Sequence, residues 1–508
     1  MIKTLVNIAN ALWGTPIIVL LFGASLYFTF RCHFVQLRHL GHQFKLLAKP
    51  TSGDVGITPF QAFCNTCAYR IGNSNISGVA IAVLFGGPGA VIWMIICSLL
   101  NAALSYAENS LGQVYKDDQD GIYEGGAYYY MEKGRGWKIL PLIFALLTVI
   151  AVPILNPMPH ANNVAGAFHN AIGIPRYVVG FTVAILLFLV ISGGIKRIAK
   201  VATIVVPFMT IVYLGLTVVT LIVNAKNVPH MLYDMVSSAF GWNAVYGALL
   251  GNAVLWGVKR SVNSSGAGMA ESLGSTSAAE VDHPGETGLV SSLTVFIDVA
   301  VCLCTGLLIM STDCYNVLGL NGQLLHLGKG SEMMAQYAAT NTADISWTQE
   351  ALNTVIPNGG ALIVAVCLLF FSFTTNMNHY YQGEIAMRYL FRKASVRTRT
   401  IAVWVLRVAM PSVYVYAAIA NSNDMWSMGD LACAILVWVN CIVLLIMGGD
   451  VVKIWRDYDT QRKAGIKVPI FDPDRLGIKN AEFWTKRNKS KFDEVNAKLK
   501  AYEKSKAA

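Results

Sequence analysis

Stretches of about 20 apolar residues recur along most of this 508-residue chain. One such stretch, coiled as an α-helix, is long enough to cross the ~30 Å hydrocarbon layer of a bilayer. The composition agrees, because 55% of the residues are hydrophobic and 13% are charged, which is about half the charged fraction of a soluble domain. The sequence therefore predicts an all-α polytopic membrane protein.

We expect about eleven membrane-spanning helices, with the seventh the least regular. Their approximate bounds are residues 15–30, 59–84, 87–107, 138–159, 177–194, 201–223, 240–258, 288–311, 359–380, 400–419 and 427–448. One transmembrane domain would occupy residues 1–450, followed by a polar, basic cytoplasmic tail at residues 451–508. In the tail, Phe492, Val495, Leu499 and Tyr502 recur at helical spacing, which predicts a short amphipathic helix beside anionic headgroups.

Lys and Arg fall almost entirely on one side of the predicted spans. The loops on that side, which continue into the basic tail, contain Arg31, Arg38, Lys45, Lys49, Lys116, Lys133, Arg135, Lys138, Lys196, Arg197, Lys200, Lys259, Arg260, Arg388, Arg392, Lys393, Arg397 and Arg399. The other side receives Lys3, Arg176, Lys226 and Lys329. Cytoplasmic loops carry the excess of basic residues, so we expect an external N-terminus and a cytoplasmic C-terminus in a bacterial plasma (inner) membrane. The net charge of +10 is then explained without nucleic acid as a partner.

Other classes of protein are disfavoured by the motifs. Most of the ten cysteines lie in apolar spans, only Cys314 is expected in an outer loop, and the Cys64–Cys67 C-x-x-C lacks the second ligand pair of a zinc site. The sequence has no H-E-x-x-H motif and no nucleophile–base pair at catalytic spacing. A channel would predict pore-lining rings rather than interrupted helices. We therefore predict no catalytic residue and no resident cofactor.

Two predicted spans contain residues that suit a membrane helix badly. The second is polar from Arg70 to Gly78, and the seventh has Gly247, Gly251 and Gly257 around Asn252. Irregular backbone at membrane depth is tolerated where it lines a cavity. The offset of five spans makes the two helices antiparallel, as two inverted five-helix repeats would, and such repeats place substrate and ion sites at the broken helices. The alternative is that the glycines only permit close helix packing.

Several motifs carry a resemblance to a known family. They are L-W-G-T-P at 12–16, Y-F-T-F-R at 27–31, T-P-F-Q-A-F at 58–63, I-G-N-S-N-I-S-G-V-A at 71–80, G-G-P-G-A-V-I-W-M at 86–94, Y-A-E-N at 106–109, G-G-A-Y-Y-Y-M-E-K-G at 125–134, D-H-P-G-E-T-G-L-V at 282–290 and Y-Y-Q-G-E at 380–384. With these the chain resembles the alanine/glycine:cation symporter family, also called sodium:alanine symporters, up to about residue 450. The resemblance implies a leucine-transporter-type 5+5 inverted-repeat fold with one extra N-terminal helix. It also implies sodium-coupled symport of small neutral amino acids such as alanine or glycine.

The chain departs from the family pattern around the expected pocket. The family's Gly-Thr-Gly-Asn reads Gly72-Asn73-Ser74-Asn75, preceded by Arg70 where a small or uncharged residue is usual. A family glutamine near the substrate amino group reads His160, a tryptophan reads His379, and Phe-Ser-Asn-Glu-Ala-Gly reads Asn263 to Gly268. An alternative is therefore a carrier of a larger, polar or acidic amino acid with altered or reduced sodium coupling.

The substrate is expected at the two interruptions. Backbone amides freed at Gly72, Asn73, Ser74 and Asn75 would bind its carboxylate, as helix N-termini bind anions. Freed carbonyls around Asn252 would take the ammonium, and Trp256 would either close over the side chain or only pack. By their match to family positions His160 and His379 would contact the substrate; the alternative is that they only form hydrogen bonds at their own helices.

The coupling ion is expected beside the first interruption. Thr374 and Thr375 offer two hydroxyl groups, and the resemblance implies that they bind sodium together with the carbonyls of Ala68 and Ile71. The alternative is that both threonines bond back to their own helix. Arg70 would pair with the substrate carboxylate or with Asp298, or replace a bound cation, because a charge at membrane depth needs a partner or a cavity. The oligomeric state stays open.

Overall fold

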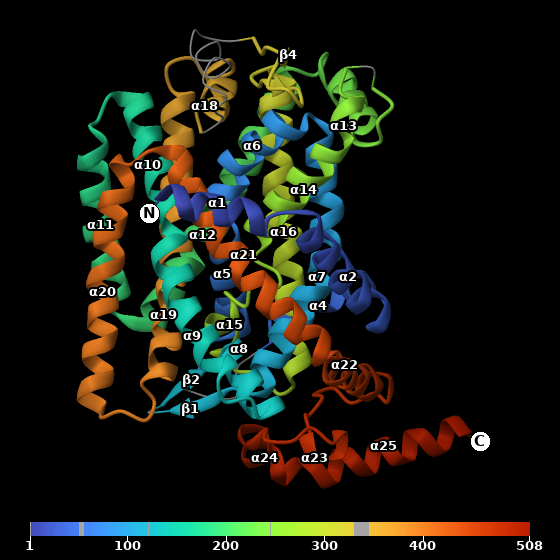
Figure 1. Cartoon of the computed structure of the whole chain (residues 1–508). Coiled ribbons are helices and arrows are strands. Elements are labelled where there is room, and N and C mark those ends of the chain that lie inside the picture. Colours follow the sequence, from blue (N-terminus) through green and yellow to red (C-terminus); the bar gives the residue numbers. More distant parts are fainter. Residues whose placement is uncertain (1, 50–54, 120, 244, 330–344, 508) are drawn as a thin grey trace.

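The computed structural model describes residues 2–49, 55–119, 121–243, 245–329 and 345–507. Within these ranges the chain is helical apart from two small hairpins and the connecting loops (Figure 1). Strand β1 (Asp117–Gln119) pairs antiparallel with β2 (Ile122–Glu124), and β3 (Val317–Leu318) pairs antiparallel with β4 (Leu324–His326). The all-α class predicted from the sequence is confirmed.

The helices in chain order are α1 (Ile2–Leu12), α2 (Thr15–Arg31), α3 (Val35–Arg38), α4 (Leu40–Leu47), α5 (Pro59–Arg70), η1 (Asn73–Asn75), α6 (Ser77–Gly86), α7 (Gly89–Val114), α8 (Ala127–Tyr129), η2 (Tyr130–Gly134), α9 (Leu140–Ile150), η3 (Ala151–Leu155), α10 (Pro157–Ile172), α11 (Arg176–Ile191), α12 (Gly194–Val223), α13 (Val228–Ala239), η4 (Gly247–Leu249), α14 (Leu250–Ser265), α15 (Leu273–Ser277), α16 (Pro284–Ser311), α18 (Ser346–Asn353), α19 (Gly360–Leu390), α20 (Val396–Ile419), α21 (Ser422–Ile446), α22 (Gly448–Lys463), α23 (Pro473–Leu476), α24 (Glu482–Asn488), η5 (Lys489–Lys491) and α25 (Phe492–Ala507).

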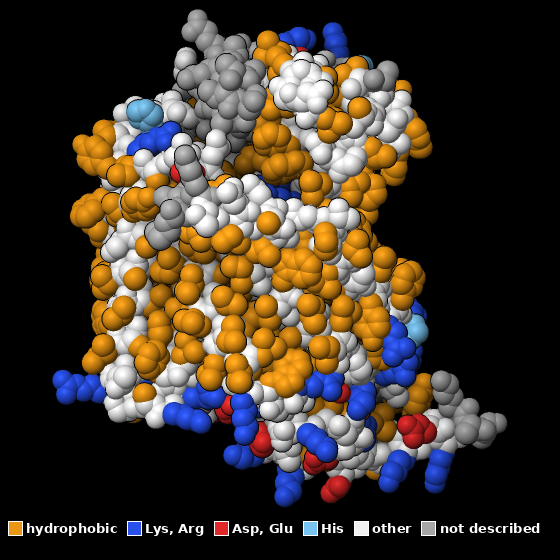
Figure 2. Space-filling model, viewed as in Figure 1, with side chains coloured by type: hydrophobic (Ala, Val, Ile, Leu, Met, Phe, Trp, Pro, Cys, Tyr) orange, Lys and Arg blue, Asp and Glu red, His pale blue; other side chains and the backbone are white. Residues whose placement is uncertain are grey.

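Seven helices in the described part of the chain are long and apolar enough to cross a membrane. They are α7, the continuous α9–η3–α10 rod, α12, α16, α19, α20 and α21. The pair α1 and α2, bent by 46°, makes an eighth if it counts as one span. The predicted number of eleven is larger because two predicted spans consist of shorter pieces and because α11 has only 16 residues. Figure 2 shows the apolar side chains as a broad band, with Lys and Arg gathered below it.

The first interruption lies where the sequence predicts it. Helix α5 ends at Arg70, the short 3-10 helix η1 follows, and α6 begins at Ser77. Between them Ile71 and Gly72 are extended, with φ values of −83° and −141°. The helical hydrogen bonds therefore stop for a few residues at membrane depth, and backbone groups are left to bind something else.

The second interruption lies later than the sequence predicts. We expected it around Gly251 and Gly257, but α14 runs unbroken from Leu250 to Ser265, and the chain leaves the helix at residues 266–272. Gly266 and Gly268 have φ values of +61° and +83°, which favour glycine and end the helix. A β-carbon on Gly257 would lie 2.8 Å from the carbonyl oxygen of Ala90 in α7. At Gly257 the close-packing alternative is therefore the correct reading.

Two buried carboxylates hold the interruptions in place. Asp298 of α16 accepts hydrogen bonds from Asn75 at 2.6 Å and from Ser264 at 2.5 Å. Glu108 of α7 accepts hydrogen bonds from the backbone amides of Gly268 at 3.0 Å and Ala270 at 3.2 Å. Helices α7 and α16 thus form a common support for both interrupted helices.

The tail packs beneath the membrane-spanning helices (Figure 1). Trp484 of α24 donates a hydrogen bond to the carbonyl of Gln113 at 3.0 Å, and Arg487 forms an ion pair with Glu280 at 2.6 Å. The predicted amphipathic helix is present as α25, in which Val495 packs with Ile470 and Leu499. The basic tail is therefore docked on the membrane-spanning helices and on the loop that carries Glu280.

Candidate functional site

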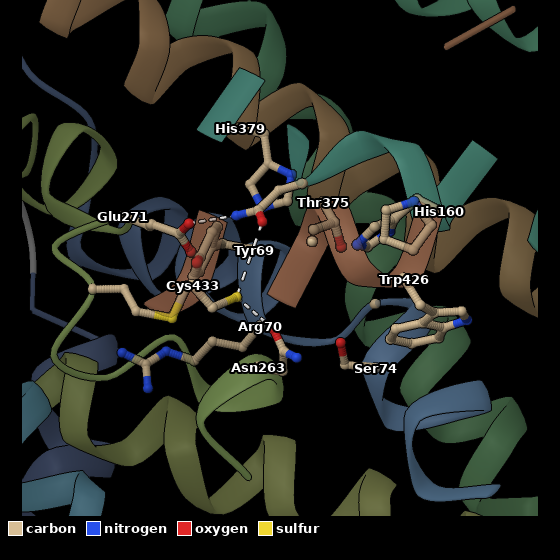
Figure 3. Close-up of a pocket in the computed structure, with 15 residues that line it drawn as sticks. Tyr69, Arg70, Ser74, His160, Asn263, Glu271, Thr375, His379, Trp426 and Cys433 are labelled. Carbon is tan, nitrogen blue, oxygen red and sulfur yellow. Dashed lines mark hydrogen bonds between the residues drawn. The ribbon is translucent and has the colours of Figure 1, made fainter. Parts of the chain in front are cut away.

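A cavity lies between the two interruptions, at the level where α5 and α14 end (Figure 3). Side chains or backbone from both interruptions and from the α9–η3–α10 rod, α19 and α21 surround it. The lining residues are Tyr69, Arg70, Gly72, Ser74, Asn156, Pro159, His160, Asn263, Met269, Glu271, Thr375, His379, Trp426, Gly429 and Cys433. Five of the predicted site residues line this cavity, namely Gly72, Ser74, His160, Thr375 and His379, together with Arg70.

Gly72 is the point where three elements meet. A β-carbon on it would lie 2.8 Å from Cε1 of His160 and 2.8 Å from Oγ1 of Thr375. Its backbone is extended, so a side chain is excluded here by the lack of space and not by the φ value. Only the absence of a side chain allows α10 and α19 to approach the first interruption this closely.

The polar groups of η1 divide into two sets. Asn75 turns away from the cavity, because its amide nitrogen donates to Asp298 and its Oδ1 accepts the Gly72 amide at 2.8 Å. Asn73 is buried and donates to the carbonyl of Pro159 at 3.3 Å. The backbone N–H groups at the start of η1 have no partner within that helix, as at any helix start. These amides, beside Ser74, form the end of the cavity suited to a carboxylate.

Two histidines and a tyrosine form the middle of the cavity wall. The ring of His379 lies 5.7 Å from that of His160 and 5.2 Å from that of Tyr69, edge to face in both pairs. The Nδ1 atoms of both histidines are buried, and neither has a hydrogen-bond partner among the described residues. Both imidazoles can therefore offer a polar atom to a molecule in the cavity.

A polar cluster at the far end was not predicted. Glu271 accepts a hydrogen bond from Asn156, and Cys433 contacts Oδ1 of Asn263 (Figure 3). Glu271 is 2% exposed, and within the described chain its second carboxylate oxygen has no partner. The sequence does show an acidic residue here, in the run G-A-G-M-A-E at 266–271. Because we expected the second interruption earlier in the chain, we assigned that run to a loop outside the site.

Three oxygens converge beside Gly72 at the predicted ion position. Oγ1 of Thr375 lies 2.8 Å from the carbonyl oxygen of Ala68, 3.2 Å from that of Ile71 and 2.8 Å from that of Phe371 in its own helix. Both threonines therefore bond back to α19, but the hydroxyl of Thr374 reaches only Phe370 and Phe371 there, at 3.0 and 3.1 Å, and takes no part at the first interruption. Uncharged oxygens of this kind suit a hard cation. The donor set therefore fits sodium, with Thr375 and not Thr374 supplying the hydroxyl oxygen.

Arg70 contributes backbone to the cavity, but its guanidinium lies elsewhere. Nη2 donates to Ser105 of α7 at 2.7 Å and to Ser291 of α16 at 3.3 Å. No ion pair with Asp298 is formed among the described residues, although that pairing was one of our expectations. The guanidinium instead lies between α7 and α16, the helices that carry Glu108 and Asp298. Its partner Ser105 lies one helical turn before Glu108 in α7.

Four residues expected at the substrate do not line the cavity, namely Asn73 and Asn75 of η1 and Asn252 and Trp256 of α14. Asn252 donates to the carbonyl of Phe85 at 3.3 Å. Trp256 stacks on the ring of Phe85, with ring centroids 4.7 Å apart, and carries the ammonium of Lys259 over its face at 4.8 Å. Both lie on α14 well before its interruption, so their distance from the cavity follows from the later position of that interruption.

The fold and the cavity at two interrupted helices define a secondary transporter. The fold is shared with MhsT, solved in complex with L-phenylalanine, with a TM-score of 0.56 at 14% identity over 78% of this chain and 91% of that one. The chain belongs to the sodium:alanine symporter family, whose profile matches residues 1–473. It is 37% identical to YrbD of Bacillus subtilis (strain 168), over 96% of this chain and 98% of that protein. It is also 34% identical to the sodium/proton-dependent alanine carrier protein of Bacillus sp. (strain PS3), over 87% and 96%.

Proposed function

We propose that this protein takes up small neutral amino acids such as alanine or glycine by sodium-coupled symport across the plasma membrane. The single observation that carries the proposal is the arrangement at Gly72. There the backbone amides of Asn73 and Ser74 at the start of η1, suited to a carboxylate, adjoin the three oxygens of Ala68, Ile71 and Thr375, suited to sodium. An ion bound beside the substrate carboxylate links the affinities for the two ligands.

The membership of the family supports this function, as does the name of the relative from Bacillus sp. (strain PS3). The 5+5 inverted repeat is proposed from the opposite directions of the two interrupted helices. The N-terminus is proposed to be outside because Lys and Arg gather at the end of the molecule where the tail lies (Figure 2). Residues 1–450 would be the transport domain and residues 451–508 its cytoplasmic tail.

The test is uptake by purified protein in proteoliposomes. Labelled L-alanine should accumulate when sodium is higher outside, and unlabelled alanine inside should accelerate its entry by counterflow. Chemical conversion of the alanine would identify an enzyme instead, and sodium-independent entry without counterflow would identify a channel.

A larger polar amino acid is the second candidate substrate. It is favoured by the polar end of the cavity, where Glu271 and Asn156 lie. Competition by a panel of amino acids against labelled alanine separates the two candidates.

A further inference from the structure

The cavity has two chemically different ends. At one end Gly72 meets His160 and Thr375, beside the backbone amides of Asn73 and Ser74 at the start of η1. At the other end Glu271 and Asn156 are joined by a hydrogen bond. In Figure 3 the rings of Tyr69 and His379 stand between the two ends. A bound amino acid that places its carboxylate at the first end extends its side chain toward the second.

The second end presents a buried carboxyl group with no basic side chain paired to it among the described residues. Glu271 is 2% exposed and forms no ion pair within the described residues, and one of its oxygens is unpartnered. Arg70 is the basic residue among those that line the cavity, but its guanidinium donates to Ser105 and Ser291 on other helices. Leaving a buried carboxylate oxygen without a donor is costly, so a ligand that brings N–H groups to this position is favoured.

The carboxyl group enters the cavity after the end of α14. The family motif has a glutamate where this sequence has Gly266, and a β-carbon on Gly266 would lie 2.5 Å from the ring of Tyr69. The tyrosine therefore occupies the space that a side chain at Gly266 would need. The acidic group enters the cavity five residues later, at Glu271, next to Asn156.

We propose that Glu271 binds the side chain of the transported amino acid and selects side chains that end in N–H groups, either a carboxamide or an ammonium. This inference rests on the proposed symport of amino acids and names the substrate class within it. Alanine fills the first end alone, whereas a side chain with N–H donors also reaches Glu271 and Asn156. An ionised acidic side chain brings no N–H group to this end and is therefore not selected.

The wild-type protein provides the first test, as a binding measurement in sodium. L-Glutamine is compared with the γ-methyl ester of L-glutamate, which has a similar shape but no side-chain N–H, and with L-ornithine, L-glutamate and L-alanine. Glutamine or ornithine should bind at least about 10-fold more tightly than alanine and than the ester, since one buried hydrogen bond contributes up to about that factor. The stronger of the two identifies a carboxamide or an ammonium as the ligand. The proposal is overturned if neither glutamine nor ornithine binds more tightly than the ester.

The variant Glu271→Gln provides the second test. It should weaken binding of the N–H side chain by about tenfold and weaken alanine binding by less, so that the ratio of the two affinities falls toward one. The matched control is Glu124→Gln, because Glu124 is also buried, bonds to Tyr129 at 2.8 Å and has one oxygen without a partner among the described residues, but lies on β2. Equal weakening of alanine and glutamine overturns the proposal, because Glu271 would then bind the α-ammonium or a coupled proton. If the wild type binds no amino acid and shows no counterflow, the proposed function itself fails.

Discussion

At the scale of single residues, the site depends on the close approach of the His160 and Thr375 side chains to the backbone of Gly72. Its neighbours His160 and Thr375 come from α10 and α19, which are far apart in sequence. One of them would contact the substrate and the other would ligate the ion. The same glycine therefore stands at the border between the proposed substrate and sodium positions.

Replacing Gly72 by leucine should abolish uptake while the protein still inserts in the membrane. The added side chain would occupy the space held by His160 Cε1 and Thr375 Oγ1, each 2.8 Å from the position of its β-carbon. The control is Gly251→Leu, since a β-carbon there meets nothing within 4 Å. Uptake at the wild-type rate by Gly72→Leu, measured with labelled alanine, would remove this residue from the site.

The two adjacent threonines should differ when each is changed to valine, which keeps the shape and removes the hydroxyl. Thr375→Val should weaken the sodium dependence of uptake by about tenfold or more, because one lost polar contact to a cation costs about 1–2 kcal/mol. Thr374→Val should change it little, because that hydroxyl bonds to its own helix. A sodium titration of uptake measures both, and equal sodium responses in the two variants would place the ion elsewhere.

Arg70 is expected to take the place of one bound cation. Its guanidinium lies between α7 and α16, which carry the carboxylates of Glu108 and Asp298 that hold the two interruptions. Arg70→Ala should lower stability by about 3 kcal/mol or more, because charges are left uncompensated in a buried setting. High sodium should restore part of that stability and make uptake depend more steeply on sodium.

Thermal unfolding of the purified Arg70→Ala variant at low and high sodium measures the effect, with Arg388→Ala as the control. Arg388 also lies near a carboxylate, with which it forms an ion pair (Glu384 at 2.8 Å), but at the end of α19 and away from the cavity. A variant Arg70→Ala with wild-type sodium response and stability would show that the arginine does not replace a cation.

At the scale of helices and strands, the sequence predicted the apolar helices and the first interruption well. A polar run with two glycines, Arg70 to Gly78, has no counterpart in an ordinary membrane helix, so its position could be predicted. The second interruption could not, because glycines serve two purposes. Gly257 packs against α7, whereas Gly266 and Gly268 adopt positive φ values. Composition alone does not separate these roles, and the error moved Asn252 and Trp256 into the predicted site and left Glu271 out.

The direction in which the helices cross the membrane gives a prediction at the same scale. A reporter active only in the cytoplasm should work when fused after the C-terminus and fail when fused ahead of the N-terminus. The physical reason is the excess of Lys and Arg in the loops on the side of the tail. Fusion after Lys226, in the loop between α12 and α13, should behave like the N-terminal fusion. The reverse pattern would contradict the orientation.

At the scale of the whole molecule, the tail connects parts of one face that belong to different helices. Trp484 bonds to the end of α7, and Arg487 pairs with Glu280 in the loop between α15 and α16. The short helix α15 separates that loop from the second interruption. A tail held in this position restrains the segment between the second interruption and α16.

The pairing of Arg487 with Glu280 should fail in acid. Burial raises the pKa of Glu280, but hydrogen bonds from Arg487 and Tyr123 and the charge of Arg487 outweigh it and hold the pKa below the usual 4.5. A lowered pKa means that this contribution to docking is present at neutral pH and is lost as pH falls below about 4.5. Limited proteolysis of the tail should accelerate there. The protease should cleave the tail of the Arg487→Met variant at neutral pH as fast as it cleaves the wild-type tail in acid. A variant whose tail resists cleavage at neutral pH would contradict the docking role.

The three oxygens of Ala68, Ile71 and Thr375 have an electrical consequence. All belong to uncharged groups, so a sodium ion bound among them keeps its full charge inside the membrane. A zwitterionic amino acid adds no net charge, and each transport cycle then moves positive charge inward. The membrane potential contributes about 2.3 kcal/mol per charge for each 100 mV. A cell that is negative inside could therefore concentrate the substrate even when sodium is equal on both sides.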